Sequence, residues 1–270
     1  MKNGKCYYNG KIVPVNEAKV SAGCDGFRQG RSVIETFACR NWKVVLFKEH
    51  LERMKRGMDT FGLKETGLDF AQVVKQVMKE NGLKEARVRI TVFRDEKGEN
   101  GEKTGVIVCA DEMPLAEITA NGVECVTGKI SWKREYDFKC GNFMEYVIER
   151  EKAEKKGAFD AILVRDGKVL EGCIANVFLV KNGELITPAV SQGIVSGIAR
   201  KAVLIAAKKI GMKAVEREVN AEELLAADEV LLTNAVRGVV AVKKIDGKKI
   251  GSGETCTRLR EQYEKMFEEI

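Results

Sequence analysis

The sequence has few of the features that would assign it to several common classes of protein. It has one histidine, His50, so a histidine-rich metal centre is not expected, and any Ser-His-Asp triad would have to include that residue. It has no G-x-x-x-x-G-K-[ST] word, and no G-x-G-x-x-G follows a predicted strand, which argues against the two common nucleotide-phosphate loops. Its apolar runs are too short to cross a bilayer, so a membrane-spanning protein is not expected either.

The cysteines and the charge exclude two further classes. Eight cysteines are present, but no two are spaced as C-x-x-C, and no apolar segment of signal-peptide type follows the first residues. We therefore expect reduced thiols in the cytoplasm rather than a disulfide framework or a structural zinc site. The formal net charge is +6, but no basic block is interleaved with aromatic residues, so nucleic acid is not an expected partner. A small anionic molecule would suit this charge, although the charge does not identify one.

The length and composition allow a sizeable core. The chain has 270 residues, of which 44% are hydrophobic, enough for one large domain or two small ones. The step Met113-Pro114-Leu115 is the best candidate for a link, because a residue before proline disfavours a continuing helix. We therefore expect a smaller N-terminal domain over residues 1–114 and a larger C-terminal domain over residues 115–270.

Helical and strand periodicities occur in mixed order along the chain. A hairpin is expected over residues 7–15, because Asn9-Gly10 suits a two-residue turn. Gly98 to Gly105 is expected to be a polar turn region. Helices are expected over residues 48–61, 70–81 (with Asp69 as N-cap), 142–156, 197–210, 221–227 and 256–267. Strands are expected over residues 32–38, 42–47, 86–94, 106–110, 122–130, 159–164, 169–171, 176–180, 185–187, 214–219, 230–233 and 239–245. The elements do not alternate strictly, which favours an α+β fold.

Two residues in the middle of the chain indicate a specific chemistry. Lys139 lies between Phe138 and Cys140, and a lysine in an apolar setting can have a lowered pKa and act as an amine nucleophile. Glu171 ends a short predicted strand, and a carboxylate facing a pyridine nitrogen keeps that nitrogen protonated, as pyridoxal 5'-phosphate (PLP) requires. Such pairs are common in a chain with 46 basic and 40 acidic residues, so the surrounding sequence has to support the assignment.

Four sequence words give that support. They occur in the order E-H-L-E-R-M (Glu49 to Met54), E-G-C-I-A-N-V-F (Glu171 to Phe178), S-G-I-A-R (Ser196 to Arg200) and A-D-E-V-L-L-T-N-A (Ala227 to Ala235). Together they resemble the class IV aminotransferases, the fold-type IV PLP enzymes, over nearly the whole chain. This family includes branched-chain aminotransferases, D-amino acid aminotransferases and 4-amino-4-deoxychorismate lyases. The resemblance implies a two-domain α+β fold like that of D-amino acid aminotransferase, a homodimer, and a small-molecule substrate.

The resemblance also implies roles for individual residues. Lys139 looks like the Schiff-base lysine, carried by the C-terminal domain, and Glu171 like the partner of the pyridine nitrogen. Arg53 looks like the phosphate-binding arginine, whose planar fork gives paired hydrogen bonds. Backbone N–H groups at a helix N-terminus are expected to bind the phosphate as well. The residues of that loop and of a second loop on the phosphate and substrate side are Gly197, Ile198, Ala199, Thr233, Asn234 and Ala235. The resemblance gives His50 no chemical role.

Departures from the family words bear on which member the chain is similar to. The branched-chain enzymes have a threonine where Ala199 stands, and a tyrosine in a G-G-N-Y word where this chain has C-G-N-F with Phe143. The D-amino acid enzymes hold the substrate carboxylate with an arginine and a histidine after the strand ending near Arg94, and no histidine lies there. The lyases have N-A in the later loop and F-E-T near the start, where this chain has Ile34-Glu35-Thr36. Arg31 stands where the family has an acid, which leaves the substrate open.

The sequence therefore predicts a PLP-dependent lyase that converts 4-amino-4-deoxychorismate to 4-aminobenzoate and pyruvate, a step of folate biosynthesis. Lys139 would remove the proton from the amine-bearing carbon, and Thr36 would assist the loss of pyruvate. The alternative is a PLP-dependent aminotransferase acting on branched-chain or D-amino acids. A second alternative is a non-catalytic relative that binds a phosphate ligand on the same fold.

Overall fold

The computed structural model describes residues 4–98, 101–114, 121–251 and 253–269. Contacts divide the chain into two compact units, one comprising Met1–Pro114, Phe138–Asn142 and Phe267–Ile270, and the other Leu115–Asp137 and Phe143–Met266. Each unit contains a largely antiparallel sheet with helices packed on it, so the predicted α+β class is confirmed.

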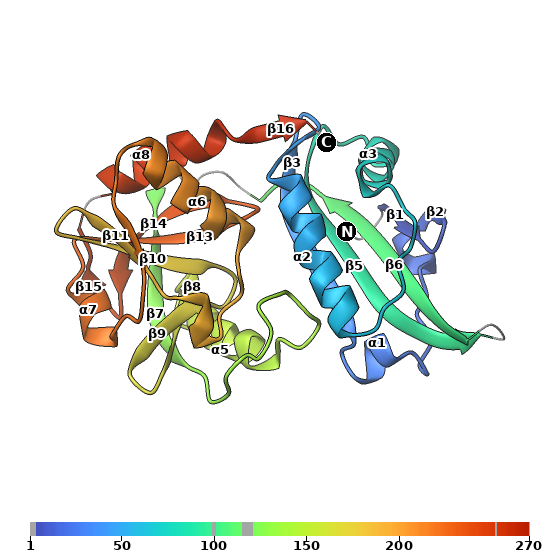
Figure 1. Ribbon diagram of the computed structural model, residues 1–270, viewed down its shortest axis with the longest axis horizontal. Coiled ribbons are helices and arrows are strands. Elements are labelled where there is room, and N and C mark those ends of the chain that lie inside the picture. The colour runs from blue at the N-terminus through green and yellow to red at the C-terminus, as the bar shows by residue number, and fades with distance from the viewer. Residues whose placement is uncertain (1–3, 99–100, 115–120, 252, 270) are drawn as a thin grey trace. The chain divides into compact units, whose positions relative to one another are not determined.

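The first unit is built on one sheet with the strand order β16-β4-β3-β5-β6-β1-β2 among the described residues. Helix α2 lies along β3, and α3 packs on β1, β5 and β6 (Figure 1). The bounds are β1 Lys5–Tyr8, β2 Lys11–Pro14, α1 Asp25–Arg28, β3 Ser32–Arg40, β4 Lys43–Val45, α2 Phe47–Thr60, α3 Phe70–Glu80, β5 Glu85–Gly98, β6 Gly101–Asp111 and β16 Phe267–Glu269.

Local sequence explains several of these elements. Asn9 and Gly10 both have positive φ, 46° and 98°, as a two-residue hairpin turn between β1 and β2 requires. Helix α3 begins where the Asp69 side chain accepts a hydrogen bond from the Gln72 amide at 3.1 Å, which confirms the predicted N-cap. The buried face of α2 includes Met54 and Met58, as its helical spacing predicts.

Two expectations for this unit are wrong. Residues 101–105 belong to strand β6, and of the expected turn region only residues 99 and 100 lie outside the described residues. The antiparallel ladder between β5 and β6 continues to the pair Gly98 and Gly101, with an irregularity after Arg94. Phe267 is not the end of a helix but begins β16, which pairs with β4 and joins the C-terminal end of the chain to the first sheet. The residues near both strands are polar, so the sequence alone gives no sign of the backbone pairing that forms these parts of β6 and β16.

The second unit is built on a sheet with the order β12-β11-β10-β13-β14-β7-β8-β9, with β15 paired to β14. Helix α5 packs on β7 and β8, whereas α6 and α8 lie side by side and pack on β13 and β14 (Figure 1). The bounds are β7 Val123–Lys129, α5 Met144–Lys155, β8 Asp160–Arg165, β9 Lys168–Gly172, β10 Asn176–Lys181, β11 Glu184–Thr187, α6 Ile198–Lys209, β12 Ala214–Glu216, α7 Ala221–Leu225, β13 Glu229–Asn234, β14 Gly238–Ile245, β15 Lys248–Lys249 and α8 Glu254–Glu264.

Short turns bring the strand ends of this unit together. Asp166-Gly167 and Asn182-Gly183 have positive φ at both residues and form the tight turns of the β8–β9 and β10–β11 hairpins. Strands β9 and β10 follow each other after a short connection, so the end of β9 and the start of β10 are close in the chain. Buried apolar residues of β8, β10, β13 and β14, among them Ile162, Leu179 and Leu232, form the core beneath them.

The segment Phe138–Asn142 groups with the first unit, whereas the sequence placed Lys139 in the C-terminal domain. The reason is backbone pairing. The amide of Ile34 donates to the Lys139 carbonyl at 2.9 Å, and the amide of Gly141 donates to the Ser32 carbonyl at 3.0 Å. Cys140 thus forms a bridge with Val33 at the edge of β3. The domain bounds 1–114 and 115–270 otherwise stay a prediction about independent folding units.

Among the described residues, no helix is both long and apolar enough to cross a membrane. Within those same residues, no group of three or more His, Cys, Asp or Glu side chains is arranged to hold a metal ion.

All eight cysteines are free thiols, and two of them face each other across strands. Cys6 of β1 is directly opposite Cys109 of β6, and their thiols contact each other. The Asn9 amide donates to the Val106 carbonyl in the same ladder, so alternation makes the Cys6–Cys109 position a non-hydrogen-bonded pair. Such a pair has Cα atoms about 4.5 Å apart, within the range that a disulfide needs.

We therefore expect diamide to convert Cys6 and Cys109 into a disulfide, removing two hydrogen atoms from the protein. Burial raises the pKa of the Cys6 thiol and raises that of Cys109 to about 12, so the reaction should be slow at neutral pH and faster in alkali. Peptide mass mapping checks the linkage, and the bond should stabilise the fold by about 2–4 kcal/mol. Cys6→Ser is the control, and a cross-link joining other cysteines would contradict the β1–β6 register.

Candidate active site

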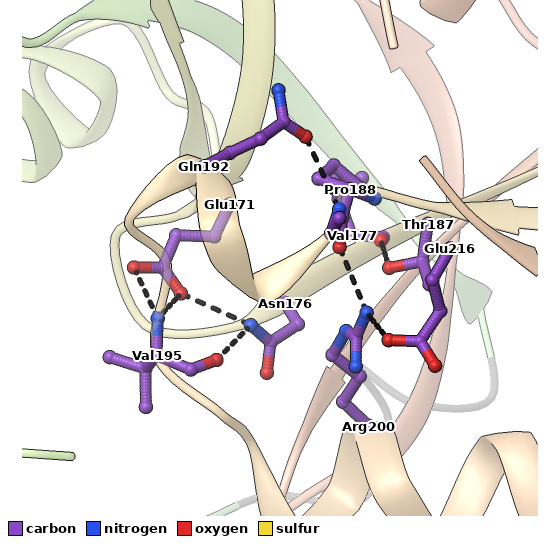
Figure 2. Close-up of polar contacts among 10 residues, drawn as sticks. Glu171, Asn176, Val177, Thr187, Pro188, Gln192, Val195, Arg200 and Glu216 are labelled. Carbon is purple, nitrogen blue, oxygen red and sulfur yellow. Dashed lines mark hydrogen bonds and ion pairs between the residues drawn. The ribbon is translucent and has the colours of Figure 1, made fainter. Parts of the chain in front are cut away.

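Glu171 is a buried carboxylate at the end of β9. Its side chain belongs to a residue only 3% exposed, and three donors hold its two oxygens. Oε1 accepts from the Tyr146 hydroxyl at 2.9 Å. Oε2 accepts from Asn176 Nδ2 at 3.1 Å, and the Val195 amide donates to both oxygens at 3.2 and 3.0 Å (Figure 2). Donors of this kind stabilise a carboxylate that has lost its water.

Tyr146 of α5 is the donor that the sequence did not reveal. Burial raises the pKa of its hydroxyl strongly, and the nearby Glu171 carboxylate raises it further. The hydroxyl therefore stays protonated and donates. Its ring lies against Phe143, and the Arg134 guanidinium lies over both rings at 5.0 and 5.4 Å. Phe143, where the chain differs from the family word, precedes this helix. No local sequence pattern, however, pairs Tyr146 with Glu171, which lies 25 positions later.

The predicted phosphate loop lies at the start of α6. Gly197 is the N-cap residue, and Ile198 and Ala199 are buried in the first helical turn. Backbone N–H groups of a first turn have no acceptor within their own helix, so they are available to an anion. A Cβ atom at position 197 would lie 1.8 Å from Asn176 Oδ1, so only glycine allows this close approach of the loop to Asn176.

The second predicted loop follows β13. Asn234 Oδ1 accepts hydrogen bonds from the Val236 and Arg237 amides at 3.1 and 2.9 Å, which fixes the turn that contains Ala235. Thr233 is directly opposite Asn176 in the β10–β13 ladder and is 1% exposed. Its Oγ1 has no hydrogen-bond partner among the described residues, which is unusual for a buried hydroxyl and suits a site that takes a polar ligand.

Arg53 lies in a buried charge cluster of the first unit. Its Nε and NH2 groups donate to the two oxygens of Glu35 at 2.8 and 2.7 Å, and His50 Nδ1 lies 2.6 Å from Glu35 Oε2. Burial would raise the pKa of Glu35, but the charge of Arg53 and the hydrogen bonds from Arg53 and His50 outweigh it and lower that pKa to about 2. Glu35 is therefore a carboxylate that fixes the plane of the Arg53 guanidinium.

His50 is neutral in this cluster. Burial lowers the pKa of its imidazole, against the opposing effect of the Glu35 carboxylate. Because a carboxylate only accepts, Nδ1 carries the proton and donates to Glu35, and Nε2 is left with a lone pair. Nε2 is buried without a hydrogen-bond partner among the described residues. Lys139, in the same unit, is near enough for its charge to lower the pKa of His50 further.

Thr36 and Arg31 complete the predicted residues of this unit. Thr36 is half-buried on β3 and faces Arg89 of β5 across the ladder, on the side of the sheet opposite to Glu35 because strand side chains alternate. Arg31 donates to the Phe61 carbonyl at 2.9 Å and lies 3.6 Å from Asp25. It therefore closes the end of α2, which gives this departure from the family word a structural role.

The structure thus collects the predicted residues in two groups, each within one unit. Lys139, Arg53 and Thr36 belong to the first unit. Glu171, the loop Gly197–Ala199 and the loop Asn234–Ala235 belong to the second. The second group fits PLP: a buried carboxylate suits the protonated ring nitrogen, and first-turn amides with an unpartnered buried hydroxyl suit a phosphate. The individual site assignments stay predictions.

Comparisons with known proteins agree with this fit. Residues 32–245 match the family described as "Amino-transferase class IV". A putative branched-chain-amino-acid aminotransferase of Methanocaldococcus jannaschii is 31% identical, with 97% of this chain and 96% of the relative covered. The D-alanine aminotransferase of Bacillus licheniformis is 30% identical over 92% of this chain and 91% of its own. The solved branched-chain aminotransferase of Thermoproteus uzoniensis with norvaline is 25% identical with a TM-score of 0.87, and 97% and 94% of the two chains are covered.

We predict that Glu35→Gln destabilises the protein near neutral pH by about 3 kcal/mol, because it leaves the Arg53 guanidinium buried without its counter-charge. The pKa of Glu35 is about 2 in the folded state against 4.5 ordinarily, so its stabilisation is complete above pH 4.5. It is lost as the pH falls towards 2, by about 1.4 kcal/mol per unit. Urea unfolding between pH 7 and pH 3.5 should therefore show the difference from wild type shrinking in acid.

The control for this change is Glu52→Gln, on the exposed face of α2, the helix that carries Arg53, and 3.9 Å from Lys48. A surface pair of this kind contributes at most about 1 kcal/mol. A pH-independent difference between wild type and Glu35→Gln would contradict the low pKa of Glu35.

Proposed function

Because this chain belongs to the class IV aminotransferase family, we propose that it is a PLP-dependent aminotransferase that exchanges an amino group between an amino acid and a 2-oxo acid. The observation that carries the proposal is the buried Glu171 carboxylate held by Tyr146, Asn176 and the Val195 amide, next to the loop that opens α6. The lyase prediction rested on short words around Thr36 and Asn234. The relatives named above are aminotransferases, so they favour the alternative over the lyase.

PLP supplies an electron sink that spreads the charge left when a proton leaves the amine-bearing carbon of the substrate. Glu171 would accept the hydrogen bond of the ring N–H and keep that nitrogen protonated. Lys139 Nζ would hold the cofactor through its aldehyde carbon, with loss of water, and would carry the proton taken from the amine-bearing carbon. The first-turn amides of Gly197, Ile198 and Ala199 and the Arg53 guanidinium would hold the phosphate.

Branched-chain amino acids are the donors we place first. The one histidine of the chain is buried against Glu35, where its donating nitrogen is occupied. It is therefore not placed to hold a substrate carboxylate in the manner expected of the D-amino acid enzymes. We further propose that the enzyme is cytoplasmic, as the pattern of its cysteines suggests, and that it is a homodimer, as the family resemblance implies. Sedimentation of the purified protein measures the oligomeric state.

The test of the cofactor chemistry uses Lys139→Ala. Wild-type protein mixed with PLP should turn yellow and retain the cofactor covalently after borohydride treatment, with the modification at Lys139 by peptide mass mapping. Lys139→Ala should lose the covalent adduct entirely, because no other amine is expected at that place. Lys133→Ala is the control, since Lys133 is a lysine of the preceding segment that has no assigned role.

The test of the reaction offers four substrates separately to the PLP-loaded protein. Leucine, valine and D-alanine are each supplied with 2-oxoglutarate, and 4-amino-4-deoxychorismate is supplied alone. Formation of glutamate with the branched-chain donors supports the proposal as stated, and glutamate formed with D-alanine alone moves it to the D-amino acid alternative. Release of pyruvate and 4-aminobenzoate without any transamination would overturn it in favour of the lyase.

A further inference from the structure

We propose that Asn176 is a positioning residue that couples the Glu171 carboxylate to the loop that opens α6. This inference rests on the function proposed above, because the coupling matters for catalysis only if that carboxylate and that loop hold the two ends of one cofactor. Asn176 is the first residue of β10 and is 5% exposed. Figure 2 shows its amide beside Glu171 and Val195, with a dashed line to each.

Both hydrogens of the Asn176 amide are used on one side. Nδ2 donates to Glu171 Oε2 at 3.1 Å and to the Val195 carbonyl at 2.9 Å. The Val195 amide in turn donates to the Glu171 carboxylate, so the three residues form a closed ring of hydrogen bonds (Figure 2). Two acceptors face this nitrogen, so an aspartate here would set a second carboxylate against Glu171 and against a carbonyl oxygen.

The other side of the Asn176 amide touches the loop directly. Its Oδ1 occupies the space that a Cβ atom of residue 197 would need, at 1.8 Å. Gly197 has φ of −67° and ψ of 133°, a conformation open to any residue, so the requirement for glycine is the contact with Asn176 and not the backbone. Side chain and loop therefore fit each other as a pair.

Asn176 also adjoins the second loop. It pairs directly with Thr233 in the β10–β13 ladder, and Thr233 carries the buried hydroxyl without a hydrogen-bond partner among the described residues. The Asn176 side chain thus contacts both the Glu171 carboxylate and the loop before α6. The residue also lies opposite the end of β13, which leads to Asn234. Tyr146 differs from Asn176 in this respect: its hydroxyl, on α5, donates a hydrogen bond to Glu171.

The coupling predicts that substitutions of Asn176 affect the ring-nitrogen end and the phosphate end of the bound cofactor together. We use Asn176→Asp and Asn176→Ala, with Tyr146→Phe as the one-ended comparison. Thr187→Val is the matched control, because Thr187 is buried in the same sheet and its hydroxyl is hydrogen-bonded to the Val177 carbonyl at 2.8 Å. Circular dichroism establishes that each variant is folded as wild type before it is compared.

Three measurements read the two ends. The pH titration of the absorbance of bound PLP reports the proton on the ring nitrogen, and the rate of PLP release reports the phosphate end. Hydrogen exchange of the peptide containing the Val195 amide, in protein without PLP, reports the ring of hydrogen bonds itself. In Asn176→Asp we expect a shifted titration, release about tenfold faster and Val195 exchange about tenfold faster, since a hydrogen bond to a charged group is lost.

The comparison variants should separate the effects. Tyr146→Phe should shift the titration but leave PLP release and Val195 exchange within about twofold of wild type. Thr187→Val should leave all three unchanged. If Asn176→Asp and Asn176→Ala move only the titration, or move nothing, Asn176 does not couple the two ends and the inference is wrong.

A double variant tests the contact with the loop. Gly197→Ala alone should accelerate Val195 exchange, because its new Cβ displaces the Asn176 amide. In Asn176→Ala the obstructing Oδ1 is gone, so adding Gly197→Ala should change the exchange rate less than about twofold. Additive effects of the two substitutions would contradict the pairing of side chain and loop.

The exchange experiment also separates this inference from the proposed function. If wild-type protein fails to bind PLP, the proposed function fails, and the coupling of Glu171 to the loop is still decided by exchange in the protein alone. If wild type binds PLP and transaminates while the Asn176 variants exchange like wild type, the function stands and the coupling is refuted.

Discussion

A carboxylate can be buried only if donors replace the water that it has lost, and this constraint organises the second unit. Glu171 ends β9, and its three donors come from α5, from the start of β10 and from the segment before α6. To satisfy one side chain, the hairpin turns, the helix and the loop must all meet at one place. The position of the α6 N-terminus is therefore tied to the carboxylate, which is what a ligand with a cation at one end and an anion at the other requires.

The first unit solves the same problem in a different way. Glu35 is fully buried, but it receives a guanidinium and an imidazole rather than an amide and a hydroxyl. The paired hydrogen bonds fix the plane of the Arg53 guanidinium. The Arg53 charge and the hydrogen bonds from both residues explain why Glu35 remains ionised at a depth that would otherwise favour the acid.

Much of the fold could be predicted because it is encoded locally. Asn9-Gly10, Asp166-Gly167 and Asn182-Gly183 mark turns whose positive φ values few residues tolerate, and Asp69 marks the start of a helix. Sequence words were enough to single out Glu171 and Gly197. Neither source could reveal the pairing of β16 with β4, whose partners lie far apart in the chain. Such pairing depends on tertiary packing, as do the contacts of Glu171 with Tyr146 and of Gly197 with Asn176.

The placement of Lys139 shows how a sheet edge can position an amine for which a catalytic role is proposed. Strand β4 pairs with β3 only at Arg40 and Lys43, so the N-terminal half of β3 is left without that neighbour. The segment around Lys139 fills this edge with two backbone hydrogen bonds, one of them to its own carbonyl. These bonds fix the main chain of Lys139 and use none of its side-chain nitrogen. The role proposed for Lys139, to bind the cofactor, release it and carry a proton, is served by a main chain held in this way, because the side-chain nitrogen then returns to the same place after each step.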